Sequence, residues 1–291
     1  MADSRIERAH DFLLREGRLL ERRRFATEFE GAPPQGVVDA LLGYRNPDGG
    51  FGHGLEPDKR SPHSQPLDVQ LAFETIVRSR ALGPAVLEVV LAACDFLASV
   101  AASDGNVALV LPGVGDFPHA PHVTEDAFPP GLNPTAMLAG LLHELQVAHP
   151  WRDRATATTF ASLEHEGVPA EAHTIHAVLC FLEHVDDRAR ADALVSRVAE
   201  VLPDAAYLRW NADDPEYGVA LTELAPSPDC PWRALFDSAG FDAHLDRLER
   251  DQQADGGWPI TWPAISDATR LEYRSIRTLD ALHVLTAYGR L

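Results

Sequence analysis

One short pattern recurs where three predicted helices end in this 291-residue chain. In each copy a leucine stands seven residues before an Asp-Gly pair, and the copies run from Leu41 to Asp48-Gly49, from Leu97 to Asp104-Gly105 and from Leu248 to Asp255-Gly256. The aspartate offers an acceptor to the backbone of a turn, and the glycine adopts the left-handed conformation in which helices often end. The first and second Asp-Gly pairs are about 50 residues apart, and the second and third are about three times as far apart. We therefore expect two degenerate copies of the pattern between them, near Gly167 and Asp204. Repeats of this length are typical of stacked helical units.

Apolar residues recur with helical spacing along most of the chain, and the long Val and Ile alternation of a central sheet is missing. The sequence therefore predicts an all-α fold with long irregular loops. The predicted helices span residues 4–24, 37–45, 66–81, 86–102, 134–147, 151–166, 170–185, 188–202, 241–253 and 272–288. Residues 207–210 and 219–224 are interpreted as short extended pieces, and 106–132, with five prolines and three glycines, as an irregular connection.

Composition excludes several classes of protein. The chain has 44 acidic against 25 basic residues and a formal charge of −19, a field that repels nucleic acid and anionic lipid. The three cysteines are far apart and fit neither a disulfide framework nor a thiolate zinc cluster. The charged N-terminal residues lack the apolar region of a signal peptide, and the apolar stretch 86–102 is short for a membrane span. We expect a cytoplasmic protein without integral membrane association.

The last copy of the repeat carries a resemblance to a known family. Residues 253–258, Gln-Ala-Asp-Gly-Gly-Trp, fit the Q-x(2–5)-G-x-W core of the QW repeat of squalene–hopene and oxidosqualene cyclases. Residues 48–52, Asp-Gly-Gly-Phe-Gly, resemble the Gly-Gly-Phe element of protein prenyltransferase β-subunits. The chain thus resembles a single-toroid member of the terpenoid cyclase and protein prenyltransferase family. The resemblance implies one α/α-toroid domain over residues 1–291, in which about five to six hairpins of inner and outer helices surround an apolar cavity.

In that family, ligand-facing residues gather in the loop that follows the Gly-Gly-aromatic element, which here is the segment 53–65. Glu56 and Asp58 are the predicted catalytic carboxylates. They are close enough to shift each other's pKa, so that one can stay protonated in an apolar mouth and protonate an alkene. The predicted substrate-binding residues come from this loop, from the irregular connection and from the equivalent loop of the last copy: His53, His63, Gln65, His119, His122, Trp262 and Tyr273.

Three functional interpretations follow. The first is a class II terpene-cyclase-like enzyme that cyclises an apolar isoprenoid-type substrate without metal or cofactor. The family's Asp-x-Asp-Asp acid motif and Asp-x-Cys zinc motif are missing, which favours the second, a non-catalytic toroid that binds a hydrophobic small molecule or a partner protein. The third is a glycoside hydrolase or lyase that pairs Glu56 and Asp58 with Asp126 or Glu272.

A metal site is a further hypothesis for the irregular connection. His119 and His122 form a His-x-x-His pair close to Glu125 and Asp126, and imidazole with carboxylate suits several divalent metals. The pair falls in a proline-rich loop, where no helix fixes the ligand geometry. We therefore predict an ordinary surface loop here and no metal.

Overall fold

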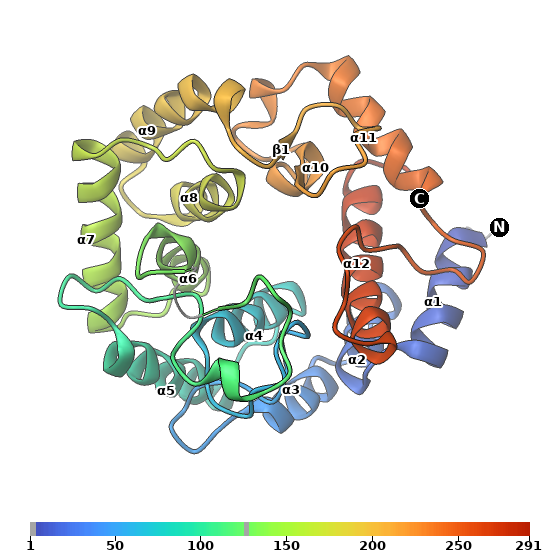
Figure 1. The fold of residues 1–291 in the computed structure, drawn as a ribbon, viewed down its shortest axis with the longest axis horizontal. Coiled ribbons are helices and arrows are strands. Elements are labelled where there is room, and N and C mark those ends of the chain that lie inside the picture. The colour runs from blue at the N-terminus through green and yellow to red at the C-terminus, as the bar shows by residue number, and fades with distance from the viewer. Residues whose placement is uncertain (1–3, 125–127) are drawn as a thin grey trace. The chain divides into compact units, whose positions relative to one another are not determined.

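The computed structural model describes residues 4–124 and 128–291, and it is mainly helical (Figure 1). The predicted all-α class is confirmed. The chain divides into two compact units, one formed by Pro33–Ala205 and the other by Ala206–Leu291 together with the N-terminal residues up to Ala32. The toroid and the single domain stay predictions.

The unit Pro33–Ala205 is built from two layers of helices (Figure 1). In the first layer α6 lies between α4 and α8, and in the second α5, α7 and α9 pack behind them. The helices are α3 (Gln35–Leu41), α4 (Pro66–Arg78), α5 (Pro84–Val100), α6 (Leu132–Glu144), α7 (Pro150–His165), α8 (Ala172–His184) and α9 (Arg188–Val201). The closest pair is α6 and α8, because Gly140 has no side chain; a Cβ there would stand 2.8 Å from the backbone of Cys180.

The other unit packs around α12, which contacts α1, α2 and α11. Its core is a cluster that includes Phe12, Phe25, Trp258 and Leu282. The elements are α1 (Ser4–Glu16), α2 (Leu19–Glu30), β1 (Leu208–Arg209), β2 (Val219–Ala220), α10 (Leu221–Leu224), α11 (Ser238–Arg250) and α12 (Asp267–Ala287). β1 and β2 pair in parallel, with Leu208 opposite Val219.

Several predicted boundaries differ from the structure. The predicted helix 4–24 is two helices, α1 and α2, because Arg18 has an extended backbone between them. Residues 221–224, predicted as extended, form the short helix α10. α12 begins five residues before its predicted start at 272, since the side chain of Ser266 caps it by accepting the backbone N–H of Thr269.

The three Asp-Gly turns have the same local geometry. In each, the aspartate Oδ1 accepts the backbone N–H two residues later, at 2.9 Å for Asp48, 2.9 Å for Asp104 and 3.1 Å for Asp255. The glycine that follows each aspartate has a φ of 90°, 97° and 97°, respectively. The upstream leucines are buried or packed against a core. The repeated turn is therefore confirmed at these three places, whereas its relation to the QW repeat stays a prediction.

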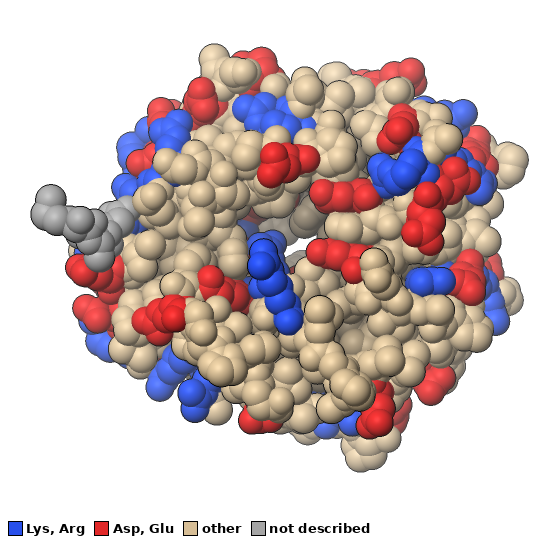
Figure 2. Space-filling model, turned by 180° about the vertical axis from the view of Figure 1, so that it is seen from behind, with Lys and Arg blue, Asp and Glu red and all other residues tan. Residues whose placement is uncertain are grey.

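Charged side chains of both signs are spread over the surface. Figure 2 shows carboxylates interspersed with basic groups over the face drawn, without one large basic patch. Many arginines pair with carboxylates; Arg190 bonds Glu164, and Arg290 contacts Asp246 at 2.9 Å and Glu249 at 3.0 Å. Within the part of the chain that the structure describes, no helix is long and apolar enough to cross a membrane.

Candidate functional site

Three charged side chains meet under the loop that follows the first Asp-Gly turn. The Lys59 ammonium lies 3.0 Å from Oε2 of Glu56 and 3.0 Å from Oδ2 of Asp68, which stands in the first turn of α4. Asp68 also accepts the backbone N–H of Glu56 at 2.8 Å. All three side chains are almost fully buried. The cluster thus fastens the loop 53–65 to the start of α4.

Burial and the opposite charges act against each other in this cluster. Burial raises the pKa of the Asp68 carboxyl to about 6, although the ammonium of Lys59 and the N–H of Glu56 favour its ionised form. For Lys59 burial alone would lower the pKa, but the carboxylates of Asp68 and Glu56 outweigh it and raise the pKa of the ammonium. The lysine therefore stays charged, and Glu56 serves as its counter-ion.

Sequence reasoning missed Lys59 and Asp68. The signal that could have found the first is its rarity, because Lys59 is the single lysine among 25 basic residues. A lysine suits this site better than an arginine, because its compact ammonium with three donors fits between two carboxylates and a planar guanidinium is larger. Asp68 carried no comparable signal. Aspartates are common in the first turn of a helix, because their negative charge interacts favourably with the helix dipole.

The predicted residue Asp58 joins the loop to the irregular connection. Its carboxylate is nearly buried and lies 3.5 Å from Nε2 of His122, while its backbone carbonyl accepts the N–H of Ala120 at 2.7 Å. Lys59 and His119 form an antiparallel bridge at the same place, and Nδ1 of His119 contacts the carbonyl of Phe117 at 2.7 Å. The structure thus brings Glu56, Asp58, His119 and His122 together.

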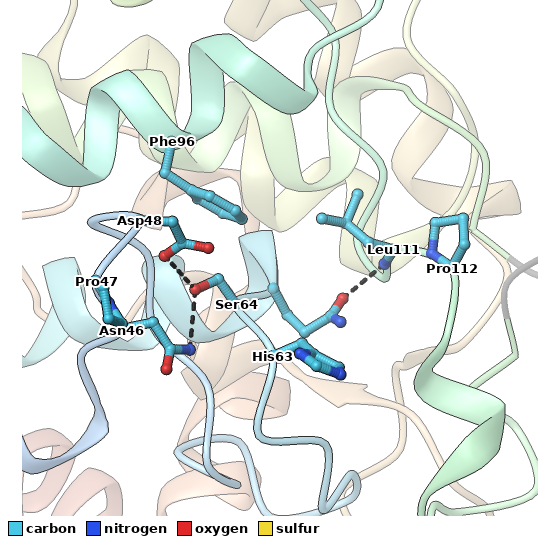
Figure 3. A pocket seen from close by; sticks show the side chains of 9 residues that line it. Asn46, Pro47, Asp48, His63, Ser64, Phe96, Leu111 and Pro112 are labelled. Carbon is cyan, nitrogen blue, oxygen red and sulfur yellow. Dashed lines mark hydrogen bonds between the residues drawn. The ribbon is translucent and has the colours of Figure 1, made fainter.

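A pocket of about 500 Å³ opens beside the first Asp-Gly turn. One wall is a hydrogen-bonded set in which Ser64 donates to Oδ1 of Asp48 at 2.7 Å and accepts from Nδ2 of Asn46 at 3.0 Å. Figure 3 shows this set beneath Phe96, with Leu111 and Pro112 on the opposite side. The pocket is therefore polar on one wall and apolar on the other.

Gln65 is the most enclosed polar residue of this pocket. Its side chain is 1% exposed, and its Oε1 accepts the backbone N–H of Leu111 at 2.6 Å. That bond fixes which end of the amide is the nitrogen. Among residues 4–124 and 128–291, Nε2 donates to no group. An amide N–H that lines a pocket and has no acceptor in the described chain can donate to a ligand oxygen.

The two remaining histidines of the loop border the same turn. His53 has a left-handed backbone, with φ of 58°, and its Nε2 lies 2.9 Å from Oδ1 of Asn46. His63 lines the pocket, and its ring meets that of Phe117 edge to face at 5.5 Å between centroids. Of the predicted binding residues, His63 and Gln65 therefore line the pocket, and His53 supports its polar wall.

Trp262 and Tyr273 belong to the other unit and pack on each other. Their ring centroids are 5.0 Å apart with planes at 86°. Tyr217 continues the row at 5.9 Å from Trp262, and Tyr207 lies 6.3 Å from Tyr217. The two predicted residues are thus part of a row of four aromatic rings, which is described further below.

Glu125 and Asp126, the acidic residues of the irregular connection in the metal and glycoside hydrolase hypotheses, lie outside the described residues. Among the residues that are described, no group of three or more His, Cys, Asp or Glu side chains is arranged to hold a metal ion.

Comparison with known proteins gives the fold and no function. No known protein family and no curated protein matches the chain. Among solved structures, the chain is similar to the crystal structure of a protein from Actinoplanes, with a TM-score of 0.60 and 16% identity over 98% of this chain and 99% of that chain. At this identity the likeness shows a shared fold alone.

Proposed function

We propose that the protein binds a small organic molecule in the pocket beside its first Asp-Gly turn. The observation that carries the proposal is Gln65, whose side-chain nitrogen belongs to a mostly enclosed residue of this pocket and has no acceptor in the described chain. A ligand oxygen at this mostly enclosed position would accept a hydrogen bond from the amide N–H, so the residue favours binding.

The lining residues indicate the chemistry of the ligand. Gln65 donates to an acceptor such as a carbonyl oxygen. Phe96 and Leu111 offer an apolar surface, and Asp48 can accept a hydrogen bond from a ligand N–H or hydroxyl at the exposed rim. We therefore propose a molecule with an apolar body and a neutral group that both accepts and donates, such as an amide. This corresponds to the non-catalytic binding interpretation of the sequence.

Acid-initiated cyclisation and glycoside hydrolysis stay predictions, and the structure gives them less support. Glu56 lies 3.0 Å from the Lys59 ammonium as its counter-ion, whereas alkene protonation needs a carboxylic acid that keeps its proton. Asp58 faces His122 rather than lining the pocket. Neither carboxylate therefore has the environment that the cyclase interpretation requires of a general acid.

The first test uses two probes of nearly equal shape, benzamide and benzamidine, in saturation-transfer NMR and titration. Benzamide presents the carbonyl that Gln65 needs, and benzamidine replaces it with donors and a positive charge. We expect benzamide to bind and to shift the backbone signals of Gln65 and Leu111. Stronger binding of benzamidine would mean that Asp48 dominates the pocket and would contradict the proposed role of Gln65.

A variant then tests the residue itself. Gln65→Glu keeps the oxygen that accepts from Leu111 but replaces the donor with an oxygen. We expect benzamide affinity to fall at least about tenfold, which corresponds to about 1.4 kcal/mol. Gln146→Glu makes the same change at an exposed position of the same unit and should leave affinity unchanged. Equal affinities of the two variants would count against the proposal.

A further inference from the structure

A second surface, in the other unit, exposes aromatic side chains. Tyr207, Trp210 and Tyr217 are 60%, 40% and 47% exposed, and they are the large aromatic residues that stand exposed in the described chain. All three belong to the segment 207–217, which contains β1 and most of the connection from β1 to β2. Exposed apolar groups that gather in one loop, rather than being scattered singly, mark interaction sites.

The fold holds this segment in a defined shape. The carbonyl of Tyr207 accepts the N–H of Val219 at 2.8 Å, which fixes the two ends of the segment beside each other. Tyr207, directly before β1, has a φ of 60°, a left-handed conformation that is unfavourable for an aromatic residue. Trp262 and Tyr273 extend the aromatic row from Tyr217, whereas the ring of Trp210 lies 6.2 Å from that of Phe236.

The same segment is acidic. It carries Asp213, Asp214 and Glu216 against one basic residue, Arg209. Asp213 is engaged by Arg247 at 3.4 Å and Arg250 at 3.2 Å, so its charge is largely balanced. Asp214 and Glu216 are exposed or half-exposed in a turn where Oδ1 of Asp214 accepts the N–H of Glu216 at 2.9 Å. Two carboxylates thus stand in the chain beside Tyr217.

We propose that this aromatic and acidic surface, defined by Tyr207, Trp210, Asp214, Glu216 and Tyr217, binds a basic peptide segment of a partner protein. The faces of aromatic rings attract guanidinium and ammonium groups, and the carboxylates add charge-assisted hydrogen bonds. The protein's formal charge of −19 steers a cationic partner toward it and repels nucleic acid. A neutral partner would use the rings but gain nothing from the carboxylates. The proposal is independent of the pocket at Gln65.

The probe is a fluorescein-labelled hexapeptide of alternating arginine and alanine, and its control replaces each arginine with citrulline, which has the same shape without the charge. Fluorescence anisotropy at about 0.15 M salt, where the Debye length is about 8 Å, suppresses long-range attraction. We expect the arginine peptide to bind at least about tenfold more tightly than the citrulline peptide. Equal binding of the two peptides would overturn the choice of a basic partner.

Two matched variants separate this surface from the general acidity of the protein. Asp214→Asn with Glu216→Gln removes two charges here and keeps the oxygen that shapes the turn. Asp95→Asn with Asp192→Asn removes two charges from side chains that are 80% and 72% exposed in the other unit. We expect the first pair to weaken binding at least about fivefold more than the second. An equal loss would reduce the binding to non-specific attraction and would overturn the proposal.

The aromatic contribution is tested by Trp210→Ala and Tyr217→Ala, with Leu82→Ala, at a residue 76% exposed in the other unit, as the control. Each aromatic variant should weaken the arginine peptide at least about fivefold. Thermal unfolding identifies any variant that fails to fold. If an aromatic variant fails to fold, the double variant Asp214→Asn with Glu216→Gln tests the proposal in its place. Unchanged affinity in both folded aromatic variants would leave no role for the rings and contradict the proposal.

Discussion

The ammonium nitrogen of Lys59 lies 3.0 Å from Oδ2 of Asp68, and both side chains are 1% exposed. Glu56 holds the same nitrogen from the other side at 3.0 Å. Two negative groups and one positive group therefore share a site that water hardly reaches. Because a buried charge without its counter-ion is costly, the lysine determines whether the two carboxylates can stay ionised there.

Replacing the lysine should strongly destabilise the fold. Lys59→Met leaves Glu56 and Asp68 buried without a counter-ion, and we expect the free energy of unfolding to fall by about 3–5 kcal/mol. Urea unfolding followed by circular dichroism measures this. Adding Glu56→Gln and Asp68→Asn to the same variant removes the uncompensated charges and should recover most of the loss. A triple variant as unstable as Lys59→Met would show that packing of the lysine stem, rather than charge, dominates.

The pH dependence of stability should carry a contribution from Asp68. Its pKa in the folded protein is about 6, above the ordinary 3.8, so the folded state holds the proton more tightly than the unfolded state. This stabilisation is fully present below the ordinary pKa and is lost as the pH rises through about 6; its size is about 3 kcal/mol. Between pH 4 and pH 7, wild-type stability should therefore fall relative to Asp68→Asn. A constant difference between the two proteins over that range would contradict the raised pKa.

The sequence predicts those parts of the site whose contacts join residues close together in the chain, and it misses those whose contacts join residues far apart. The segment 53–65 is predicted correctly as a place where polar residues gather, because it directly follows a recognisable turn. The roles of Glu56 and Gln65 are not predictable in the same way. They depend on Asp68 in α4 and on the N–H of Leu111 in a distant connection, and no local pattern encodes those partners.

Amine chemistry offers a direct probe of the buried lysine. Lys59 is the single lysine of the chain and is 1% exposed, so a succinimidyl ester should modify only the N-terminal amine of the folded protein at pH 8. The ammonium is also a poor nucleophile there, because its two carboxylate neighbours raise its pKa. Mass spectrometry should find a second modification only after unfolding in urea. Rapid modification of Lys59 in the native protein would mean that the cluster opens frequently.

The fold as a whole is more predictable than the site, for a physical reason. Helical periodicity and Asp-Gly turns act over a few residues, so the all-α class and the repeated turn follow from sequence. The break between α1 and α2 was missed, since the apolar stripe runs on across Gly17 and Arg18. The aromatic row was only half predicted, because Tyr207 and Tyr217 reach Trp262 through the pairing of two very short strands.

The three repeated aspartates should differ in their effect on stability although their turns are alike. Asp104 bonds the main chain and side chain of Asn106 at an exposed position, so Asp104→Ala should cost about 1 kcal/mol. Asp48 also accepts from the buried Ser64, and its loss should cost more. Asp255 makes two bonds, of 2.7 and 2.8 Å, to Arg274, whose side chain is 5% exposed. Asp255→Ala should therefore cost the most, about 3 kcal/mol.

The cause of that order can be separated from the turn itself. Arg274 lies 4.7 Å from the centre of the Phe12 ring and donates to the carbonyl of Trp258, so removing Asp255 leaves a cation buried against the core. Adding Arg274→Met to Asp255→Ala removes the cation, and the double variant should be more stable than the sum of the single losses implies, by about 1–3 kcal/mol. If the losses simply add, the two residues act independently. In that case the turn bond from Gly257 would account for the loss at Asp255, and Asp255→Ala should cost no more than Asp104→Ala in urea unfolding.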